Sequence, residues 1–271
     1  VMKAAAENLS GVTLELGGKS PVIIDGTGDT KEIAEKTAWG KTLNCGQTCI
    51  APDYVLIQEK ELESFISEFK TAVNKFYNAH NNGLDKAAEY GRIIDDKNFS
   101  RVETILNDAV KKGATIVFGG EHIREDKFME PTLLTNVTND MLVMQEEIFG
   151  PILPIMTYNK NSDVIQLLQK MPSPLAIYIM SSKKKNIEYF LDHTVSGGVG
   201  INELMLTPVN PGLPFGGINN SGMGKSGGKH SFTDFSNEKG IIKKNFGNLL
   251  KLVYPPYKKS IFKYFKHIVR L

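Results

Sequence analysis

The sequence has little cysteine, no excess of charge of one sign and no long apolar run, and each absence excludes a class of protein. Two cysteines among 271 residues cannot build a disulfide framework, so a reducing, cytoplasmic compartment is the simpler expectation. A formal net charge of +2 gives no general attraction to nucleic acid. No run of about 18 apolar residues occurs, and no basic segment followed by an apolar core opens the chain. Neither a spanning helix nor a signal peptide is therefore predicted.

Phosphate-binding and metal-binding motifs are also lacking. The segment 219–226 ends in Gly-Lys-Ser, but Asn219 stands where a P-loop needs glycine, and segment 13–20 fails in the same way at Thr13. No Gly-x-Gly-x-x-Gly follows a strand and opens a helix, so the dinucleotide fingerprint is absent. The five histidines are scattered without a pair at metal spacing, and no metal site is predicted.

Alternating apolar patterns predict an α/β fold with a mostly parallel sheet. Thr30 is a candidate N-cap for a helix that runs to about Leu43. Residues 208–230 are rich in Gly, Pro and Asn and are predicted to be loop. The predicted strands cover 12–16, 21–24, 54–57, 115–118, 152–158, 175–180 and 198–201, and the other predicted helices cover 61–76, 96–112, 163–169 and 185–191. The helix over 61–76 is predicted to have one apolar face, made of Leu62, Phe65, Ile66, Phe69 and Val73.

A thiol and a carboxylate, each in a glycine-bearing segment, are the candidate chemical groups. Cys49 follows Gly-Gln-Thr near a loop or helix start, where the pKa of a thiol is expected to fall. Glu15 lies in an apolar strand before a Gly-Gly pair. A thiolate attacks carbonyl carbon well, and a carboxylate can activate water. The alternatives are an inert core cysteine and a glutamate on a solvated face. Cys45 is interpreted as structural.

Several ordered motifs extend over nearly the whole chain. The first is Glu-Leu-Gly-Gly-Lys-Ser-Pro at 15–21, the second is Gly-Gln-Thr-Cys at 46–49, and the third is Glu-Glu-Ile-Phe-Gly-Pro at 146–151. Glycine-rich loops follow at 214–217, 220–224 and 228–232. In this order they resemble the glutamate, cysteine and cofactor-contact motifs and the closing loops of the aldehyde dehydrogenase family. The segments 47–54 and 254–257 and the later loops resemble its class 3, fatty-aldehyde branch most.

The resemblance implies a fold and a division of the chain. It implies an aldehyde dehydrogenase-like catalytic domain with a mostly parallel sheet, preceded by the tail end of a Rossmann-like cofactor domain. The expected segments are a cofactor-domain remnant at 1–48, a catalytic domain at 49–230, an oligomerisation segment at 231–250 and a basic tail at 251–271. A homodimer is expected by the same analogy.

The resemblance also implies a reaction. Cys49 would add to a medium- or long-chain aliphatic or an aromatic aldehyde, NAD or NADP would accept hydride, and Glu15 would activate the water that hydrolyses the thioester. Glu147, Phe149 and Leu16 would contact the cofactor. Without the resemblance, Glu147 would be interpreted as a surface acid before a strand.

One departure from the family pattern qualifies this reaction. The chain lacks most of the cofactor domain, including an asparagine that would supply half of an oxyanion hole. It is therefore expected to be a C-terminal portion that is inactive or only residually active alone. The alternatives are a cofactor-independent thiol esterase or acyltransferase and a non-catalytic remnant. No histidine stands in a recognisable pairing context for Cys49, which argues against the esterase.

The C-terminal tail is basic and amphipathic. After Glu238 no acidic residue occurs, and apolar residues interleave with lysines at helical spacing. One interpretation is peripheral contact with an anionic membrane, which would make the protein membrane-associated. The other is a cover for the substrate entrance or a dimer partner.

Overall fold

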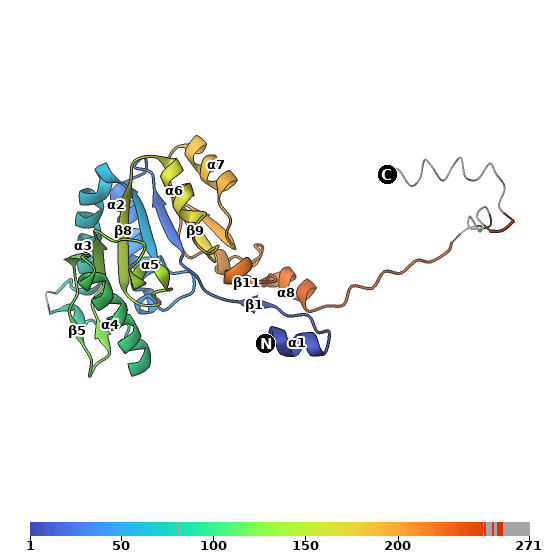
Figure 1. The fold of residues 1–271 in the computed structure, drawn as a ribbon, viewed down its shortest axis with the longest axis horizontal. Coiled ribbons are helices and arrows are strands. Elements are labelled where there is room, and N and C mark those ends of the chain that lie inside the picture. The colour runs from blue at the N-terminus through green and yellow to red at the C-terminus, as the bar shows by residue number, and fades with distance from the viewer. Residues whose placement is uncertain (81, 246, 248–250, 252–253, 257–271) are drawn as a thin grey trace. The chain divides into compact units, whose positions relative to one another are not determined.

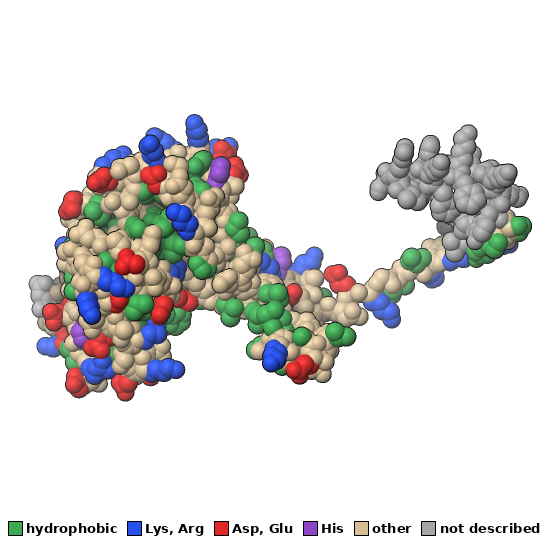
Figure 2. All heavy atoms as spheres, in the orientation of Figure 1, with side chains coloured by type: hydrophobic (Ala, Val, Ile, Leu, Met, Phe, Trp, Pro, Cys, Tyr) green, Lys and Arg blue, Asp and Glu red, His purple; other side chains and the backbone are tan. Residues whose placement is uncertain are grey.

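The computed structural model describes residues 1–80, 82–245, 247, 251 and 254–256 (Figure 1). The chain divides into two compact units, Val1–Phe235 and Ser236–Leu271. Every named helix and strand of the described residues belongs to the first unit. Figure 2 shows acidic and basic side chains interspersed over the visible face of this unit, in agreement with a net charge close to zero.

A seven-stranded sheet forms the centre of the first unit, in the order β10-β9-β2-β3-β8-β7-β4. All neighbouring strands are parallel except β4, which pairs with β7 in the antiparallel sense. The predicted α/β fold with a mostly parallel sheet is confirmed. The strands are β2 (Pro21–Ile24), β3 (Tyr54–Gln58), β4 (Thr115–Phe118), β7 (Thr132–Thr135), β8 (Ile152–Tyr158), β9 (Ala176–Met180) and β10 (Gly198–Ile201).

Helices connect and cover these strands, with α2 and α3 on one side of β8 and α6 and α7 on the other in Figure 1. Their buried residues recur at helical spacing, as in α3, where Phe65, Ile66, Phe69 and Val73 form the predicted apolar face. The helices are α1 (Met2–Glu7), α2 (Thr30–Thr42), α3 (Leu62–Tyr77), α4 (Asp96–Lys111), α5 (Leu142–Gln145), α6 (Asn161–Leu168), α7 (Lys184–His193) and α8 (Gly228–Asp234).

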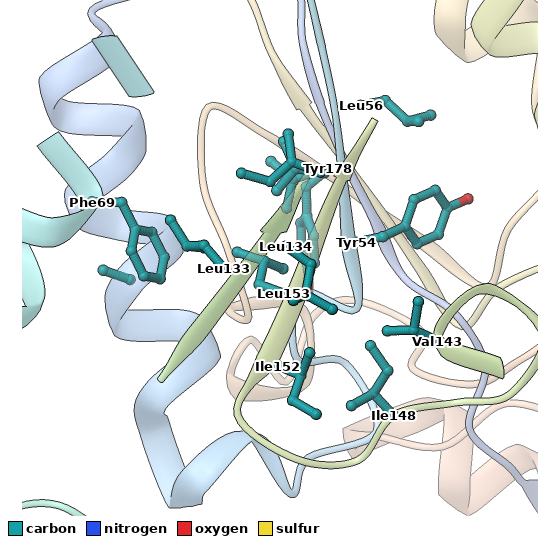
Figure 3. Packing of buried hydrophobic residues seen from close by; sticks show 14 of the residues in the cluster. Tyr54, Leu56, Phe69, Leu133, Leu134, Val143, Ile148, Ile152, Leu153 and Tyr178 are labelled. Atoms are coloured by element: carbon teal, nitrogen blue, oxygen red, sulfur yellow. The ribbon is translucent and has the colours of Figure 1, made fainter. Parts of the chain in front are cut away.

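The core lies along the central strands, as Figure 3 shows for Tyr54, Leu56, Leu153 and Tyr178. All four residues of β2 are buried. A parallel strand covered by helices on both faces buries every side chain, which explains the unbroken apolar run in β2. Full burial of one such aliphatic side chain contributes about 1.5–3 kcal/mol.

The start of α2 differs from the prediction. Asp29, and not Thr30, is the N-cap: its carboxylate accepts hydrogen bonds from the Lys31 and Glu32 amides. Thr30 is already helical, and its hydroxyl donates to Glu61 at 2.9 Å. Aspartate and threonine are both common N-caps, so the adjacent pair was ambiguous in the sequence.

Short elements were predicted least well. The strand expected over 12–16 is only β1 (Leu14–Glu15), which pairs with β11 (Gly222–Met223). Strand β7 was missed, as was the small hairpin of β5 (His122–Ile123) and β6 (Phe128–Met129). Helix α8 begins inside the predicted loop 208–230. Strands of two residues give too few apolar repeats to show a period.

The predicted domain boundaries remain predictions. The strands β2 and β3 stand on either side of the boundary expected at 48/49 and are neighbours in one sheet. Most of the tail at 251–271, with its predicted amphipathic helix, lies outside the described residues. Among the residues that the structure does describe, no helix has the length and apolar content that crossing a membrane requires.

Candidate active site

The candidate site lies at the amino edge of the central sheet. Glu15 precedes β2, Cys49 precedes β3, and Glu147 precedes β8 in the chain. These three strands are parallel neighbours, with Pro21 opposite Tyr54 in the register. Segments that enter parallel neighbouring strands meet at the same edge of the sheet. The topology therefore brings together three motifs that lie far apart in the sequence.

A tight turn carries the chain from α2 to Cys49. Cys45 has a φ of 56° and Gly46 a φ of 73°, both in the left-handed region. A Cβ at Gly46 would lie 2.3 Å from the Gly150 carbonyl oxygen, so only glycine allows this approach. The Gln47 side chain donates to the Arg92 carbonyl at 2.9 Å and accepts from the Ile94 amide at 2.9 Å. The turn before the thiol is thereby fixed to the following loop.

Cys49 is half-buried and packs against the core. Burial raises the pKa of its thiol, and the negative charges of Glu147 and Glu15 raise it further. Hydrogen bonds from backbone amides oppose this shift without reversing it. The expected fall of this pKa is therefore wrong for this chain, because desolvation and two carboxylates outweigh the turn's amides.

Cys45 is fully buried, and its thiol donates to the Tyr90 hydroxyl at 3.5 Å. Burial raises the pKa of this thiol to about 11. The Tyr90 hydroxyl in turn donates to the Met129 carbonyl at 2.8 Å. This environment agrees with the structural interpretation of Cys45.

Glu15 lies in β1 and is exposed, and its carboxylate accepts a hydrogen bond from the Ser226 hydroxyl. Ser226 follows the loop that matches the closing motifs, so the loop orients the carboxylate. The next residue, Leu16, is exposed, and its amide donates to the Ser221 carbonyl at 3.1 Å. The sequence did not reveal Ser226 as a partner, because 211 positions separate it from Glu15.

Glu147 is partly buried and lies against the Gly17-Gly18 pair. A Cβ at Gly17 would lie 2.0 Å from one carboxylate oxygen of Glu147. Burial raises the pKa of Glu147 to about 7, the Asp53 charge adds to this, and a hydrogen bond from the Gly18 amide opposes it. Glu147, Gly18 and Lys19 line a cavity of about 470 Å³. The carboxyl group can therefore hold or release a proton near neutral pH.

Phe149 is exposed and has a φ of 45°, so the chain turns sharply at this residue. Arg101 fixes the turn from α4: its guanidinium donates to the Glu147 carbonyl at 3.2 Å and to the Ile148 carbonyl at 2.8 Å. Leu16 and Phe149 thus both present apolar surface at the edge that carries Cys49.

The structure adds residues that the sequence analysis missed. Lys19 and Asp53 form a buried ion pair. Lys41, in the last turn of α2, is 1% exposed. Burial lowers the pKa of Lys41 to about 8. Nothing in the spacing of these charges indicates that they meet, because their proximity follows from strand pairing.

A second cavity, of about 380 Å³, has a mostly apolar wall. Tyr178 forms part of its wall and donates from its hydroxyl to the Ile50 carbonyl at 2.6 Å. Other lining residues include Val199, Ile201, Met205, Leu206, Val209 and Leu213. Within the described residues, no cluster of three or more His, Cys, Asp or Glu could hold a metal ion.

A mostly parallel sheet covered by helices, with a thiol and two carboxylates at its amino edge, defines an α/β domain with a candidate active site. The model of the aldehyde dehydrogenase family matches residues 1–241, and the chain belongs to this family, whose members are oxidoreductases.

The similar proteins include curated enzymes and a solved structure. The chain is 42% identical to the 4,4'-diaponeurosporen-aldehyde dehydrogenase of Staphylococcus aureus, over 98% of the chain and 56% of that protein. It is 41% identical to mouse aldehyde dehydrogenase family 3 member A2, over 96% of the chain and 52% of that protein. A structure described as the substrate-bound state of Staphylococcus aureus AldH matches with a TM-score of 0.91 and 41% identity, over 99% of the chain and 57% of that chain. The chain thus spans about half the length of these relatives.

Proposed function

We propose that the chain is the catalytic portion of an NAD(P)-dependent aldehyde dehydrogenase of the class 3 type. The observation that carries this proposal is that the segments bearing Glu15, Cys49 and Glu147 enter three neighbouring parallel strands at one sheet edge, where both carboxylates raise the pKa of the Cys49 thiol. A cysteine with an exposed carboxylate in reach has the two groups that thioester formation and hydrolysis require.

The proposed reaction assigns one task to each group. The Cys49 sulfur adds to the aldehyde carbon and forms a thiohemiacetal. NAD(P), held by Glu147, Phe149 and Leu16, would supply the hydride acceptor for oxidation of the thiohemiacetal to a thioester on Cys49. Glu15 takes a proton from water, the water oxygen adds to the thioester carbon, and the carboxylic acid leaves as the thiol is restored. The Cys49 amide would donate to the oxyanion, a contact typically worth about 2.7–4 kcal/mol.

The residues present fit the nicotinamide end of NAD(P). The absence of a side chain at Gly17 leaves the Glu147 carboxyl group in the cavity, where it can accept hydrogen bonds from a ribose diol. Phe149 and Leu16 offer apolar surface that a nicotinamide ring can cover. Glu147, Phe149 and Leu16 would therefore hold this end of the cofactor.

The apolar cavity supports an aldehyde with an aliphatic or aromatic body. Its wall residue Tyr178 contacts the Ile50 carbonyl, one residue from Cys49. A concave apolar site with few polar groups suits such a ligand. A homodimer and peripheral membrane contact through the tail remain proposals from the family resemblance and from the tail sequence.

Two activities measured side by side test the proposal. The chain, alone and joined to the N-terminal half of a full-length relative, is assayed for aldehyde-dependent reduction of NAD(P) and for hydrolysis of an activated ester. We expect cofactor reduction by the joined protein, its loss in Cys49→Ser, and a thioester trapped on Cys49 in Glu15→Gln, detected by mass spectrometry.

The other outcomes separate the alternatives. Ester hydrolysis that needs Cys49, without any cofactor reduction, would indicate a cofactor-independent esterase or acyltransferase. The absence of both activities in a folded joined protein would indicate a non-catalytic remnant.

A further inference from the structure

One ammonium group joins the three segments of the candidate site. Lys19 lies in the segment 15–21 that begins with Glu15, called here the glutamate segment. It forms its ion pair with Asp53, which follows Cys49 by four positions in the nucleophile segment, 46–53. The same ammonium donates to the Val143 carbonyl at 2.8 Å and to the Glu146 carbonyl at 2.8 Å. Lys19 therefore contacts both the nucleophile segment and the segment that carries Glu147.

These contacts hold the backbone immediately before and immediately after Glu147. Lys19 binds the carbonyl of the preceding residue, Glu146, while the second carboxylate oxygen of Asp53 accepts from the amide of the following residue, Ile148, at 2.9 Å. The ion pair thus holds the peptide groups before and after Glu147. A lysine ammonium has three donors, and here all three are used on three acceptors.

Burial makes the pair more than a surface contact. The side chains of Lys19 and Asp53 are 8% and 4% exposed. An ion pair of this kind contributes little net stability relative to apolar residues, and its best-supported use is to specify one arrangement of the groups around it. The hydrogen bonds of Lys19 and Asp53 with the backbone all fall within residues 143–148. They can therefore specify one arrangement of this segment.

We propose that Lys19, acting with Asp53, is a positioning residue that holds the Glu147 carboxyl group at the sheet edge that carries Cys49. The inference deepens the proposed function, because it assigns the control of that same site's geometry to a residue outside the reacting groups. The field of Glu147 at the Cys49 sulfur reports this geometry directly, without aldehyde or cofactor.

The test is a double-mutant cycle in the 271-residue chain. The pKa of the Cys49 thiol is measured from the pH dependence of its alkylation by iodoacetamide, with tandem mass spectrometry to distinguish Cys49 from Cys45. Glu147→Gln removes a negative charge and should lower this pKa. In the Lys19→Met background, the same substitution should produce at most half of that change.

Further variants keep folding defects apart from positioning. Lys19→Met leaves Asp53 buried without its partner, so Lys19→Met/Asp53→Asn is measured as well: it removes both charges and retains an oxygen for the Ile148 amide. Lys75→Met is the matched control, because Lys75 pairs with Glu35 between α2 and α3 and contacts none of the three segments. Here the full effect of Glu147→Gln is expected.

Two results would overturn the proposal. One is an equal effect of Glu147→Gln with and without Lys19 in folded proteins, and the other is no effect of Glu147→Gln in the parent chain. Neither result bears on aldehyde oxidation, which the activity assays test separately.

Discussion

The carboxyl group of Glu147 lies against the α-carbon of Gly17. An added Cβ at Gly17 would stand 2.0 Å and 2.4 Å from its two oxygens, closer than any van der Waals contact. The Glu147 carboxyl group therefore occupies the place that a Cβ would take at residue 17, and glycine alone leaves that place free.

Gly17→Ala is expected to displace the Glu147 carboxyl group. Because the clash involves the end of a flexible side chain, the free energy of unfolding should change by less than about 1 kcal/mol. In the protein joined to a cofactor domain, the KM for NAD(P) should rise about tenfold, the equivalent of one lost hydrogen bond to a charged group.

Gly11→Ala is the control for this substitution, since a Cβ at Gly11 meets nothing within 4 Å. Steady-state kinetics and urea unfolding of both variants give the comparison. Similar KM values for the two variants would contradict the role assigned to the Gly17–Glu147 contact.

Glu147 should make the stability of the fold depend on pH. Burial raises its pKa from 4.5 to about 7, so between these pH values the folded chain binds more protons than the unfolded chain. The free energy of unfolding must then fall as the pH rises through this window. After a discount for partial exposure, the loss is about 1–2 kcal/mol.

Urea unfolding at several pH values between 4.5 and 8 measures this dependence. Glu147→Gln should lack the decrease, while Glu146→Gln, at the exposed neighbouring residue, should retain it. The assignment fails if both variants follow the parent profile.

Lys41→Met is expected to stabilise the chain at pH 7. Burial lowers the pKa of Lys41 from 10.5 to about 8, so its ammonium is charged at pH 7 at a cost of roughly 2–3 kcal/mol. The unfolded chain binds more protons between these pH values, so the parent gains stability as the pH rises from 8 to 10.5. The advantage of the variant should shrink over the same range.

Lys31→Met, on the exposed side of α2, provides the comparison and should leave stability nearly unchanged. Chemical denaturation at pH 7 and pH 10 is sufficient. A Lys41→Met variant less stable than the parent at pH 7 would show that the ammonium has a partner essential to the fold.

Tyr178→Phe should lower the free energy of unfolding and make the segment that follows Cys49 more mobile. The substitution leaves the buried Ile50 carbonyl without its hydrogen bond, which costs about 1–2 kcal/mol. Tyr54→Phe is a close control, because the hydroxyl of this equally buried tyrosine donates, among the described residues, to the Met171 sulfur at 3.5 Å and to no backbone carbonyl. Alkylation of Cys49 should change in Tyr178→Phe alone, and equal changes in both variants would refute the argument.

Elements with a distinct apolar pattern were predictable from the sequence. The unbroken apolar run of β2 and the apolar face of α3 both appear where they were predicted. Their signals are local, because burial on two faces or on one face imposes its own residue pattern. The two-residue β1 carries no such pattern and depends on its partner β11, and the helix α8 buries no residue that could form an apolar face.

The candidate residues were predictable only as members of motifs. Cys49, Glu15 and Glu147 were named from segments that resemble one family, and the sheet topology accounts for their common edge. The direction of the Cys49 pKa shift was predicted wrongly. Its local turn favours a lower value, and the carboxylates that oppose it come from residues 34 and 98 positions away in the printed sequence.

The sequence by itself therefore determined the fold class, the principal strands and helices, and the chemical groups available for catalysis, because these depend on residue type and local period. Only the tertiary structure decided which charges share a site. The contacts of Lys19 with Asp53 and the Glu146 carbonyl, and of Glu147 with Gly17, arise where parallel strands bring distant segments to one edge. Burial at that edge then sets the protonation of each group, and no local pattern encodes burial of this kind.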